Sequence, residues 1–364
     1  MSRYLLAIGV VVSAVGVLAT VAPGVGSVEV SALQSGGRNQ PAYSFEEIAD
    51  GVHFAIGTGA MTVMSNSLVI INDDHVMLVD TSVSPAAARA LVDQIKQELT
   101  DKPIRYVFNS HYHFDHAHGN QIFGDDAEII GHDFVRQMHL TNVLAQRTNQ
   151  SFSVGIPGQI ERLKQQIAET TDAPERARLE TSLRVREAHW AAIQEVDVKP
   201  PNVTYSDAMT IHKGGREVQL HFVGRGHTGG DTMVFLPAER IVFTGDFFVG
   251  RPEGSSLSYM GDAYIDEWPA SLEQLKGLEF DIIVPGHGTP FRDRSQIDNF
   301  QAYLRALWTR VSEFRAQGLS ADEAVQRIDM SDYAPQYGER AQSVDPRAVM
   351  RIYELLQVQM PMEP

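Results

Sequence analysis

Short apolar runs separated by turn residues fill the first part of the chain. Runs at residues 52–56, 67–71 and 75–79 have the length and β-branched content of strands, and Asn72-Asp73-Asp74 favours a hairpin between the last two. Ser84 followed by Pro85 is typical of a helix start, so we expect a helix from there to residue 99. A buried strand at residues 104–109, a short helix and a strand at 128–130 complete this part.

The pattern changes twice further along. Between residues 133 and 195 strand signals vanish and apolar residues recur at helical spacing, with breaks at Pro157-Gly158 and Asp172-Ala173-Pro174, which predicts two or three helices. Strands return at residues 205–212, 217–223, 232–236, 240–243 and 281–284, with a helix at 264–278. From residue 295 the pattern predicts one long helix and two shorter ones. The chain should therefore mix strands and helices, with a helical insertion that either shapes the substrate site or only adds core or oligomer contacts.

One short segment carries the first candidate chemistry. His111, His113, Asp115 and His116 directly follow the strand expected at residues 104–109. Side chains two residues apart emerge on the same side of an extended backbone, so His111 and His113 can bind one metal ion together. Asp115 and His116 can turn toward a second ion. Because zinc takes about four donors per ion, further ligands must come from elsewhere in the chain.

Three later turns offer those ligands. His227 lies in the segment Gly-His-Thr-Gly-Gly-Asp, Asp246 in Thr-Gly-Asp, and His287 in Gly-His-Gly. Each segment follows an apolar strand-like run, and its glycines let the backbone approach an ion closely. The absence of cysteine from the chain leaves only nitrogen and oxygen donors for a metal.

In this order, H-x-H-x-D-H, G-H-T, T-G-D and G-H-G resemble the motifs of the metallo-β-lactamase superfamily, over residues 45–291. The resemblance implies an α+β fold, a four-layer αβ/βα sandwich, and a site for two divalent cations. By matching motif, the first cation would be held by His111, His113 and His227, the second by Asp115, His116 and His287, and Asp246 would bridge both.

Asp246 points to a particular part of that superfamily. Its β-lactamases generally carry Cys or Ser where Asp246 stands, whereas hydroxyacylglutathione hydrolases and many lactonases carry the bridging Asp. The resemblance therefore implies a hydrolase in which a hydroxide bridging two ions attacks an ester, thioester, lactone or amide carbonyl. Zinc is the default metal, with iron or manganese open. Asp115 would orient the hydroxide and shuttle its proton.

Alternatives to this activity stay open. β-Lactam hydrolysis is one, and iron-dependent redox chemistry, as in other members of the superfamily, is another. A metal-dependent binding protein is a third, although an intact Asp115 argues against it. Bound zinc with turnover would favour hydrolysis, while bound iron without hydrolysis would favour redox chemistry.

Other polar residues near the motifs are expected to have supporting roles. His118 should lie beside the ligands without binding metal, because the ligand set is complete without it. Asp80 and Asp231 should be acceptors that hold loops near the metals, and Tyr259 and Tyr264 are candidates for a phenol that faces substrate. The remaining histidines lie in ordinary strand or helix patterns and should be structural or solvated: His53, His75, His132, His139, His189, His212 and His221.

Composition and the N-terminal residues predict the cellular compartment and the kind of partner. With 43% hydrophobic and 21% charged residues, the 364-residue chain should be globular, and its net charge of −16 argues against a nucleic-acid partner. Arg3 followed by an apolar run predicts a signal peptide, residues 1–27, and hence a periplasmic or secreted protein; an uncleaved membrane anchor is the alternative. We expect a linker at 28–44, a catalytic domain at 45–293 with the helical insertion at 133–195, and a helical extension at 294–364. The expected partner is a small acyl substrate, with no stable membrane contact if the signal is cleaved, and no pattern indicates an oligomeric state.

Overall fold

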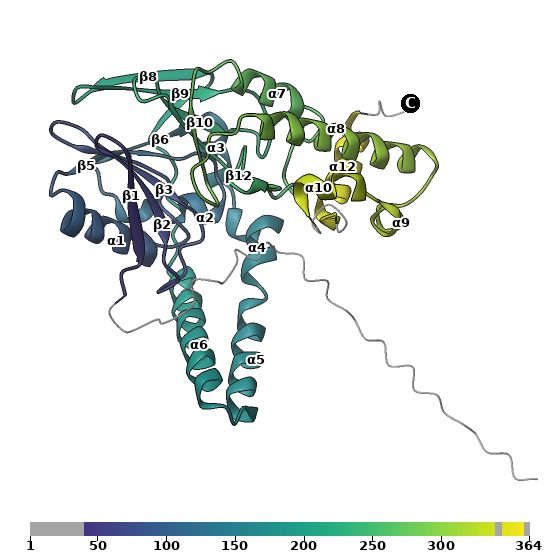
Figure 1. The fold of residues 1–364 in the computed structure, drawn as a ribbon, viewed down its shortest axis with the longest axis horizontal. Coiled ribbons are helices and arrows are strands. Elements are labelled where there is room, and N and C mark those ends of the chain that lie inside the picture. The colour runs from purple at the N-terminus through teal and green to yellow at the C-terminus, as the bar shows by residue number, and fades with distance from the viewer. Residues whose placement is uncertain (1–39, 339–343, 360–364) are drawn as a thin grey trace, which may run out of the picture.

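Two sheets packed face to face form the centre of the structure, a computed structural model that describes residues 40–338 and 344–359 (Figure 1). The expected signal peptide and most of the expected linker lie outside the described residues. Within the described part of the chain, no helix combines the length and the apolar character that a membrane span requires.

The strands of each sheet follow a simple order. The first sheet runs β1 (Tyr43–Ala49), β2 (Val52–Gly57), β3 (Ser67–Ile71), β4 (Val76–Val79), β5 (Ile104–Phe108), β6 (Glu128–His132) and β7 (Val203–Tyr205), with parallel pairing from β4 onward. The second runs β14 (Ile282–Pro285), β11 (Ile241–Gly245), β10 (Thr232–Leu236), β9 (Arg216–Phe222) and β8 (Ala208–Lys213). A small hairpin pairs β12 (Gly250–Arg251) with β13 (Gly254–Ser255).

The central strands are apolar on both faces because both faces are covered. In β3, Leu68 and Ile70 pack into the core between the sheets, whereas Val69 packs into the core under the first layer of helices. In β10, Val234 faces the core between the sheets and Met233 faces the helices on the far side. This alternation is the period-two geometry of a strand, and it explains why the strands appear in the sequence as continuous apolar runs.

Helices cover the outer face of each sheet. The first sheet is covered by α1 (Pro85–Gln94) and its π-helical continuation η2 (Ile95–Leu99), with α2 (Phe114–Ala117) and η3 (His118–Ile122) beside them. The second is covered by α7 (Trp268–Leu275), α8 (Ser295–Ala316), α9 (Ala321–Arg327) and α12 (Pro346–Gln359), with η5 (Ser331–Tyr333) and α10 (Ala334–Tyr337) between the last two. The predicted α+β sandwich with a helical C-terminal extension is confirmed.

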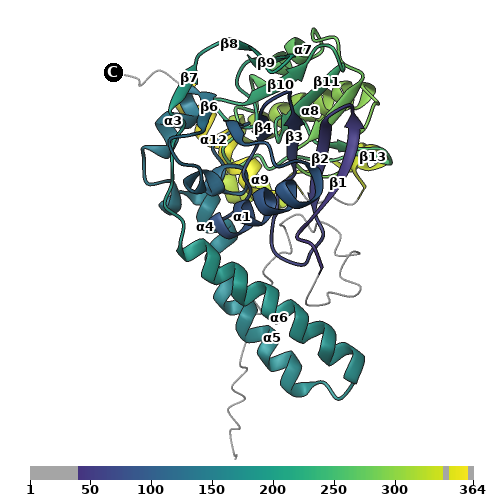
Figure 2. The ribbon, with the colours of Figure 1, turned by 90° about the vertical axis from the view of Figure 1, so that its left-hand side faces the viewer.

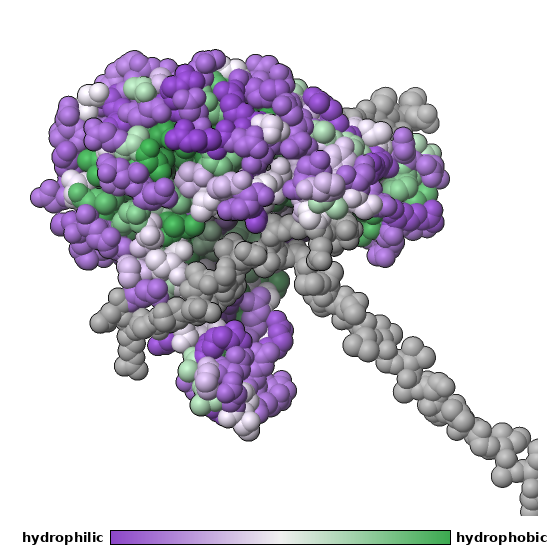
Figure 3. Space-filling model, in the orientation of Figure 1, coloured by the Kyte–Doolittle hydropathy of each residue, from purple (hydrophilic) through white to green (hydrophobic). Residues whose placement is uncertain are grey.

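The insertion contains more helices than the sequence predicted. Residues 133–195 form five helical segments rather than two or three: α3 (Asp133–His139), η4 (Val143–Ala145), α4 (Arg147–Ser153), α5 (Ile156–Glu169) and α6 (Ala173–Gln194). The break expected at Pro157 is the start of α5, where proline is tolerated. Figures 1 and 2 show α5 and α6 projecting from the body as a helical hairpin, and Figure 3 shows that its visible surface is mostly hydrophilic.

Three other elements differ from the prediction. Strand β1 was not predicted, and its first two residues fall in the segment expected to be a linker. The single strand expected at residues 205–212 is two strands that belong to different sheets, β7 and β8. The helix expected at 264–278 is shorter, because α7 begins only at Trp268.

Candidate metal centre

The seven predicted ligands lie together where strands of both sheets end. His111, His113, Asp115 and His116 follow β5, and Asp246 follows β11. His227 lies between β9 and β10, and His287 follows β14. Six of the seven are buried and only His287 is partly exposed. Gly286 permits the close packing, because a Cβ at this position would lie 2.4 Å from Asp246 Oδ1.

The donor atoms of these residues form three overlapping groups, each within 4.8 Å: His111, His113 and His227; His111, His116 and Asp246; and Asp115, His116 and His287. Asp246 lies between the two histidine sets. Its Oδ1 is 3.3 Å from His116 Nε2, and its Oδ2 is 3.2 Å from His287 Nε2 and 3.8 Å from His227 Nε2. The first and third groups contain the same residues as the two ligand sets that the resemblance implied. The Asp246 carboxylate lies close to histidines of both sets.

Each of the five histidines has one ring nitrogen engaged by an acceptor outside the site. The pairs are His111 Nδ1 with Ser110 Oγ (3.0 Å), His113 Nε2 with Asp262 Oδ2 (3.2 Å), His116 Nδ1 with Asp80 Oδ2 (2.6 Å), His227 Nδ1 with the Tyr259 carbonyl (2.9 Å) and His287 Nδ1 with the Met64 carbonyl (3.2 Å). Ser110 Oγ can only accept here, because its own proton goes to Asp80. The outer nitrogens therefore carry the protons, and the inner nitrogens present lone pairs to the centre.

Converging lone pairs are what a bound cation requires. His111 Nε2, His116 Nε2 and Asp246 Oδ1 are buried and have no hydrogen-bond partner. His113 Nδ1 lies 2.9 Å from His227 Nε2, and with both outer nitrogens protonated neither of these two atoms can donate to the other. Buried polar atoms are normally satisfied, so this cluster fits divalent cations that accept nitrogen and oxygen ligands.

Electrostatics divides the site into two parts. Burial lowers the pKa of His111 well below its usual value and that of His227 to about 3, so these imidazoles are neutral, as ligation requires. Burial also disfavours a charged His287, but the carboxylates of Asp246 and Asp115 outweigh it and raise the pKa of His287 to about 10. The pKa of His116 is raised for the same reason. The acidic part of the site thus favours positive charge, for which protons and cations compete.

Two aspartates hold the surrounding loops, as expected. Asp80 accepts hydrogen bonds from the Ser110 amide (2.8 Å), Ser110 Oγ (2.7 Å) and His116, and its backbone has φ of 60°, which is uncommon for a residue other than glycine. Asp231 accepts hydrogen bonds from the amide and hydroxyl of Thr228 and so closes the turn that carries His227. Both carboxylates fix segments that supply candidate ligands.

The other sequence candidates lie outside the ligand groups. His118 is buried beside the Phe114 ring, and burial lowers its pKa to about 3. Tyr259 supplies its carbonyl to His227, while its hydroxyl lies 3.3 Å from Thr148 Oγ1. The Tyr264 ring contacts the guanidinium groups of Arg225 and Arg351. Among the described residues, none of the seven histidines expected to be structural belongs to a ligand group.

Sequence reasoning did not identify the outer partners of His111, His113, His227 and His287, and Asp262 and Met64 illustrate why. Asp262 accepts the hydrogen bond from His113, and the Met64 carbonyl accepts the one from His287. Nothing in the local pattern around Asp262 distinguishes it from an ordinary turn aspartate. Met64 acts through its backbone, with φ of 72°, so its side-chain type carries no signal for this role.

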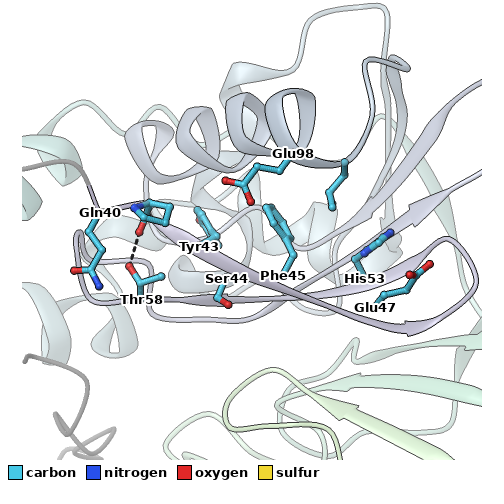
Figure 4. Close-up of a pocket in the computed structure, with 10 residues that line it drawn as sticks. Gln40, Tyr43, Ser44, Phe45, Glu47, His53, Thr58 and Glu98 are labelled. Atoms are coloured by element: carbon cyan, nitrogen blue, oxygen red, sulfur yellow. Dashed lines mark hydrogen bonds between the residues drawn. The ribbon is translucent and has the colours of Figure 1, made fainter.

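A pocket of about 500 Å³ lies elsewhere, on β1 and β2 (Figure 4). Gln40 and Thr58 lie at one end of it, and Glu47 and His53 at the other. None of the seven candidate ligands lines this pocket. It brings together no cluster of donors comparable to the site at the strand ends, so we assign the chemistry to the latter.

Comparison with known proteins agrees with this fold. Residues 60–287, well over half of the chain, match the metallo-beta-lactamase superfamily. Over 283 residues the chain is 21% identical to a linear primary-alkylsulfatase of a Pseudomonas species, covering 72% of this chain and 50% of the relative. Over 228 residues it is 23% identical to a metallo-beta-lactamase type 2 of Bacteroides fragilis, covering 62% and 70%. A 2,4-dinitroanisole O-demethylase subunit alpha of a Nocardioides species is 24% identical over 222 residues, covering 61% and 52%.

Solved structures show the same fold. A metallo-beta-lactamase from Pontibacter korlensis superposes with a TM-score of 0.52 at 18% identity, covering 72% of this chain and 99% of that one. The VMB-1 structure superposes with a TM-score of 0.51 at 19% identity, covering 73% and 98%. The chain belongs to the metallo-β-lactamase superfamily. It spans only about half the length of the alkylsulfatase and of the O-demethylase subunit.

Proposed function

We propose that the chain is an exported hydrolase that holds two divalent cations, by default zinc, and cleaves an ester, thioester, lactone or amide bond. The observation that carries this proposal is that the inner nitrogens of five histidines and the carboxylates of Asp115 and Asp246 form three overlapping groups, and that His111 Nε2, His116 Nε2 and Asp246 Oδ1 are buried without a hydrogen-bond partner. Seven donors are more than one tetrahedral ion can use.

The residues divide between the two cations as the three groups suggest. His111, His113 and His227 would hold one, Asp115, His116 and His287 the other, and Asp246 would contact both. Two cations bound there would lower the pKa of a shared water toward neutrality and polarise the bond to be cleaved.

Asp115 is the residue of this chain that we assign to proton transfer. Burial raises the pKa of its carboxyl, but His116 and His287 outweigh this effect and hold the pKa at about 2. Asp115 is therefore ionised near neutral pH, and its Oδ2 lies 3.2 Å from His287 Nε2 and 3.6 Å from His116 Nε2. An ionised carboxylate at this position can orient a water by accepting its hydrogen bond and can then take up its proton.

The outer hydrogen bonds preserve this arrangement. Asp80, Asp262 and the carbonyls of Tyr259 and Met64 keep the imidazole protons outside the site. The inner nitrogens thus remain available to cations without a change of tautomer.

Two other substrates have support from relatives. The alkylsulfatase among the relatives favours sulfate esters, and the type 2 metallo-beta-lactamase favours β-lactams. Against β-lactams stands Asp246, since the β-lactamases of the superfamily generally carry Cys or Ser there. Iron-dependent redox chemistry remains the alternative from another class of reaction, because nitrogen and carboxylate ligands also suit iron.

The test is a substrate panel on the full chain, prepared metal-free and then loaded with Zn²⁺, Mn²⁺ or Fe²⁺. The panel contains lactones, thioesters, esters, amides, β-lactams, and sulfate and phosphate esters. We expect acyl substrates to turn over only after metal loading, and Asp115→Asn to lower kcat by about 10²- to 10⁴-fold. Turnover of β-lactams or sulfate esters alone would replace the proposed substrate class. Bound iron with no hydrolysis of any substrate would favour the redox alternative.

The proposed compartment and partners have their own test. We expect the chain in its native host to fractionate with periplasmic or secreted proteins, because of the apolar run after Arg3. We also expect no binding to DNA or RNA at physiological salt, because the net charge is −16. Retention in the membrane fraction would indicate an uncleaved anchor.

A further inference from the structure

A segment that contains no candidate ligand holds two histidines of the first ligand group. Residues 258–264 lie between β13 and α7. The Tyr259 carbonyl accepts a hydrogen bond from His227 Nδ1 (2.9 Å), and Asp262 Oδ2 accepts one from His113 Nε2 (3.2 Å). The position of this segment therefore determines how both imidazoles face the first cation.

Asp262 accepts more hydrogen bonds than the Tyr259 carbonyl does. Besides His113, its Oδ2 accepts hydrogen bonds from the Tyr112 hydroxyl (2.8 Å) and from the Thr148 hydroxyl of α4. These donors outweigh the effect of burial and hold the pKa of Asp262 well below its usual value. Asp262 is thus an ionised acceptor for His113, and a helix of the insertion takes part in holding it.

Two arginines hold the backbone on either side of Asp262. Arg147 of α4 donates to the Gly261 carbonyl through Nη2 (2.6 Å), and Arg351 of α12 donates to the Ala263 carbonyl through Nε (2.8 Å). The insertion and the C-terminal extension therefore contact the same short stretch of backbone from two different helices.

Glu354 joins these two arginines. Its Oε1 lies 2.7 Å from Arg147 Nη1, and its Oε2 lies 3.2 Å from Arg351 Nη1. Arg351 and Glu354 are three residues apart on α12, so they lie on the same face of the helix. The three charged side chains form a continuous network from α4 to α12 that holds the backbone on both sides of Asp262.

We infer that Arg147, Arg351 and Glu354 act as a clamp that positions Asp262, and through it His113, for binding of the first cation. The inference rests on the proposed function, since it assigns a role in a metal site. It gives the C-terminal extension a part in the chemistry, although none of the described residues of the extension belongs to a ligand group. The three clamp residues and Asp262 are positioning residues, because none of them belongs to a ligand group.

A clamp of this kind can be separated from a purely structural ion pair. The side chains of Arg147 and Glu354 are 39% and 45% exposed, and ion pairs this exposed add little to stability. A variant of Glu354 should therefore fold while the position of Asp262 changes. A matched control exists in the same extension, where Arg310 pairs with Asp332 (2.6 Å), whose side chain is 57% exposed. The hydrogen bonds of Arg310 go to Asp329, Met330 and Asp332, all within the extension.

The experiment compares Asp262→Asn, Glu354→Lys and the control Asp332→Lys in the full chain. Each metal-free protein is titrated with Zn²⁺ against a competing chelator, which measures the affinity of the protein for each of the two ions. The absorption spectrum of the Co²⁺-loaded protein reports how the ligands are arranged. Asp262→Asn should lower the affinity for one ion by about 10- to 100-fold and leave the affinity for the other unchanged. Glu354→Lys should lower the affinity for the same ion by about tenfold. Asp332→Lys should bind both ions with wild-type affinity.

A double variant tests whether Glu354 acts through Asp262. If it does, Glu354→Lys should change affinity far less in the Asp262→Asn background than in the wild type, because coupled residues are not additive. Equal effects in both backgrounds, or wild-type affinity for both ions in Glu354→Lys, would overturn the clamp. A wild-type chain that binds no metal ion would instead contradict the proposed function, and the inference with it.

Discussion

Replacing Asp80 by asparagine tests how the protein fixes the protonation of a metal ligand. Asp80 and His116 are both fully buried, and Asp80 Oδ2 lies 2.6 Å from His116 Nδ1. The carboxylate accepts two more hydrogen bonds, from the amide and hydroxyl of Ser110. Asparagine keeps the shape of the side chain but turns one oxygen into an NH₂ donor. If its oxygen stays on the Ser110 amide, the new donor faces His116 Nδ1–H.

The expected losses of stability and of metal affinity follow from these two hydrogen-bond donors facing each other. A buried donor without an acceptor costs about 1–3 kcal/mol of stability. His116 can relieve the clash by moving its proton to Nε2, but Nε2 is the nitrogen that faces Asp115 and Asp246 in the site. Loss of an outer partner usually weakens metal binding by about 10- to 100-fold, and we expect this loss for the ion at Asp115, His116 and His287. The ion at His111, His113 and His227 should keep its affinity.

The assay is a Zn²⁺ titration of metal-free Asp80→Asn against a chelator, with thermal unfolding of the metal-free chain measured beside it. Asp281→Asn is the matched control, because Asp281 pairs with Arg240 at the surface (2.8 Å) and lies outside the site. Wild-type affinity for both ions in Asp80→Asn would refute the idea that Asp80 sets the tautomer of His116. Equal weakening of both ions would show a general disruption of the fold instead.

Three further predictions concern the site, the core and the insertion. Asp246→Ala should lower the affinity for the second ion more than that for the first, because the first retains three histidines. In a titration that follows both bound metal and reaction rate, excess metal should restore part of the turnover. Burial lowers the pKa of His139 to about 4, so the folded chain takes up this proton less readily than the unfolded chain. Stability is then lost as pH falls through the unfolded pKa, by about 2 kcal/mol between about pH 7 and about pH 5, and denaturant unfolding of metal-free His139→Gln should show a flatter pH dependence. Replacing residues 156–194 by a short linker should change relative kcat/KM across the substrate panel more than metal content, because the hairpin contains no candidate ligand; unchanged relative rates would leave it a structural insert.

The candidate ligands could be predicted because their spacing is local and chemically specific. His111, His113, Asp115 and His116 fall within six residues after a strand, and the other three stand in glycine-rich turns after strands. Parallel strands that end at the same edge bring such turns together, so the pattern predicts proximity without knowledge of the full topology. The α+β class followed from the same apolar runs.

Features that depend on tertiary contacts could not be predicted. Strand β1 carries Glu46 and Glu47 near its middle, so its apolar alternation is too weak to identify it. The division of residues 205–212 between two sheets depends on which neighbour each half pairs with, and a continuous strand-like pattern does not record that choice. Asp262 became significant only when the fold placed it beside His113, about 150 residues away in sequence.

The central claim is that the site holds two metal ions, and metal content tests it most directly. The purified chain, freed of metal and then saturated with Zn²⁺, is analysed for bound metal per chain while turnover of its substrate is recorded. Seven converging donors predict two ions per chain, with full activity reached only when the second has bound. Saturation at one ion per chain with full activity would contradict the two-cation site.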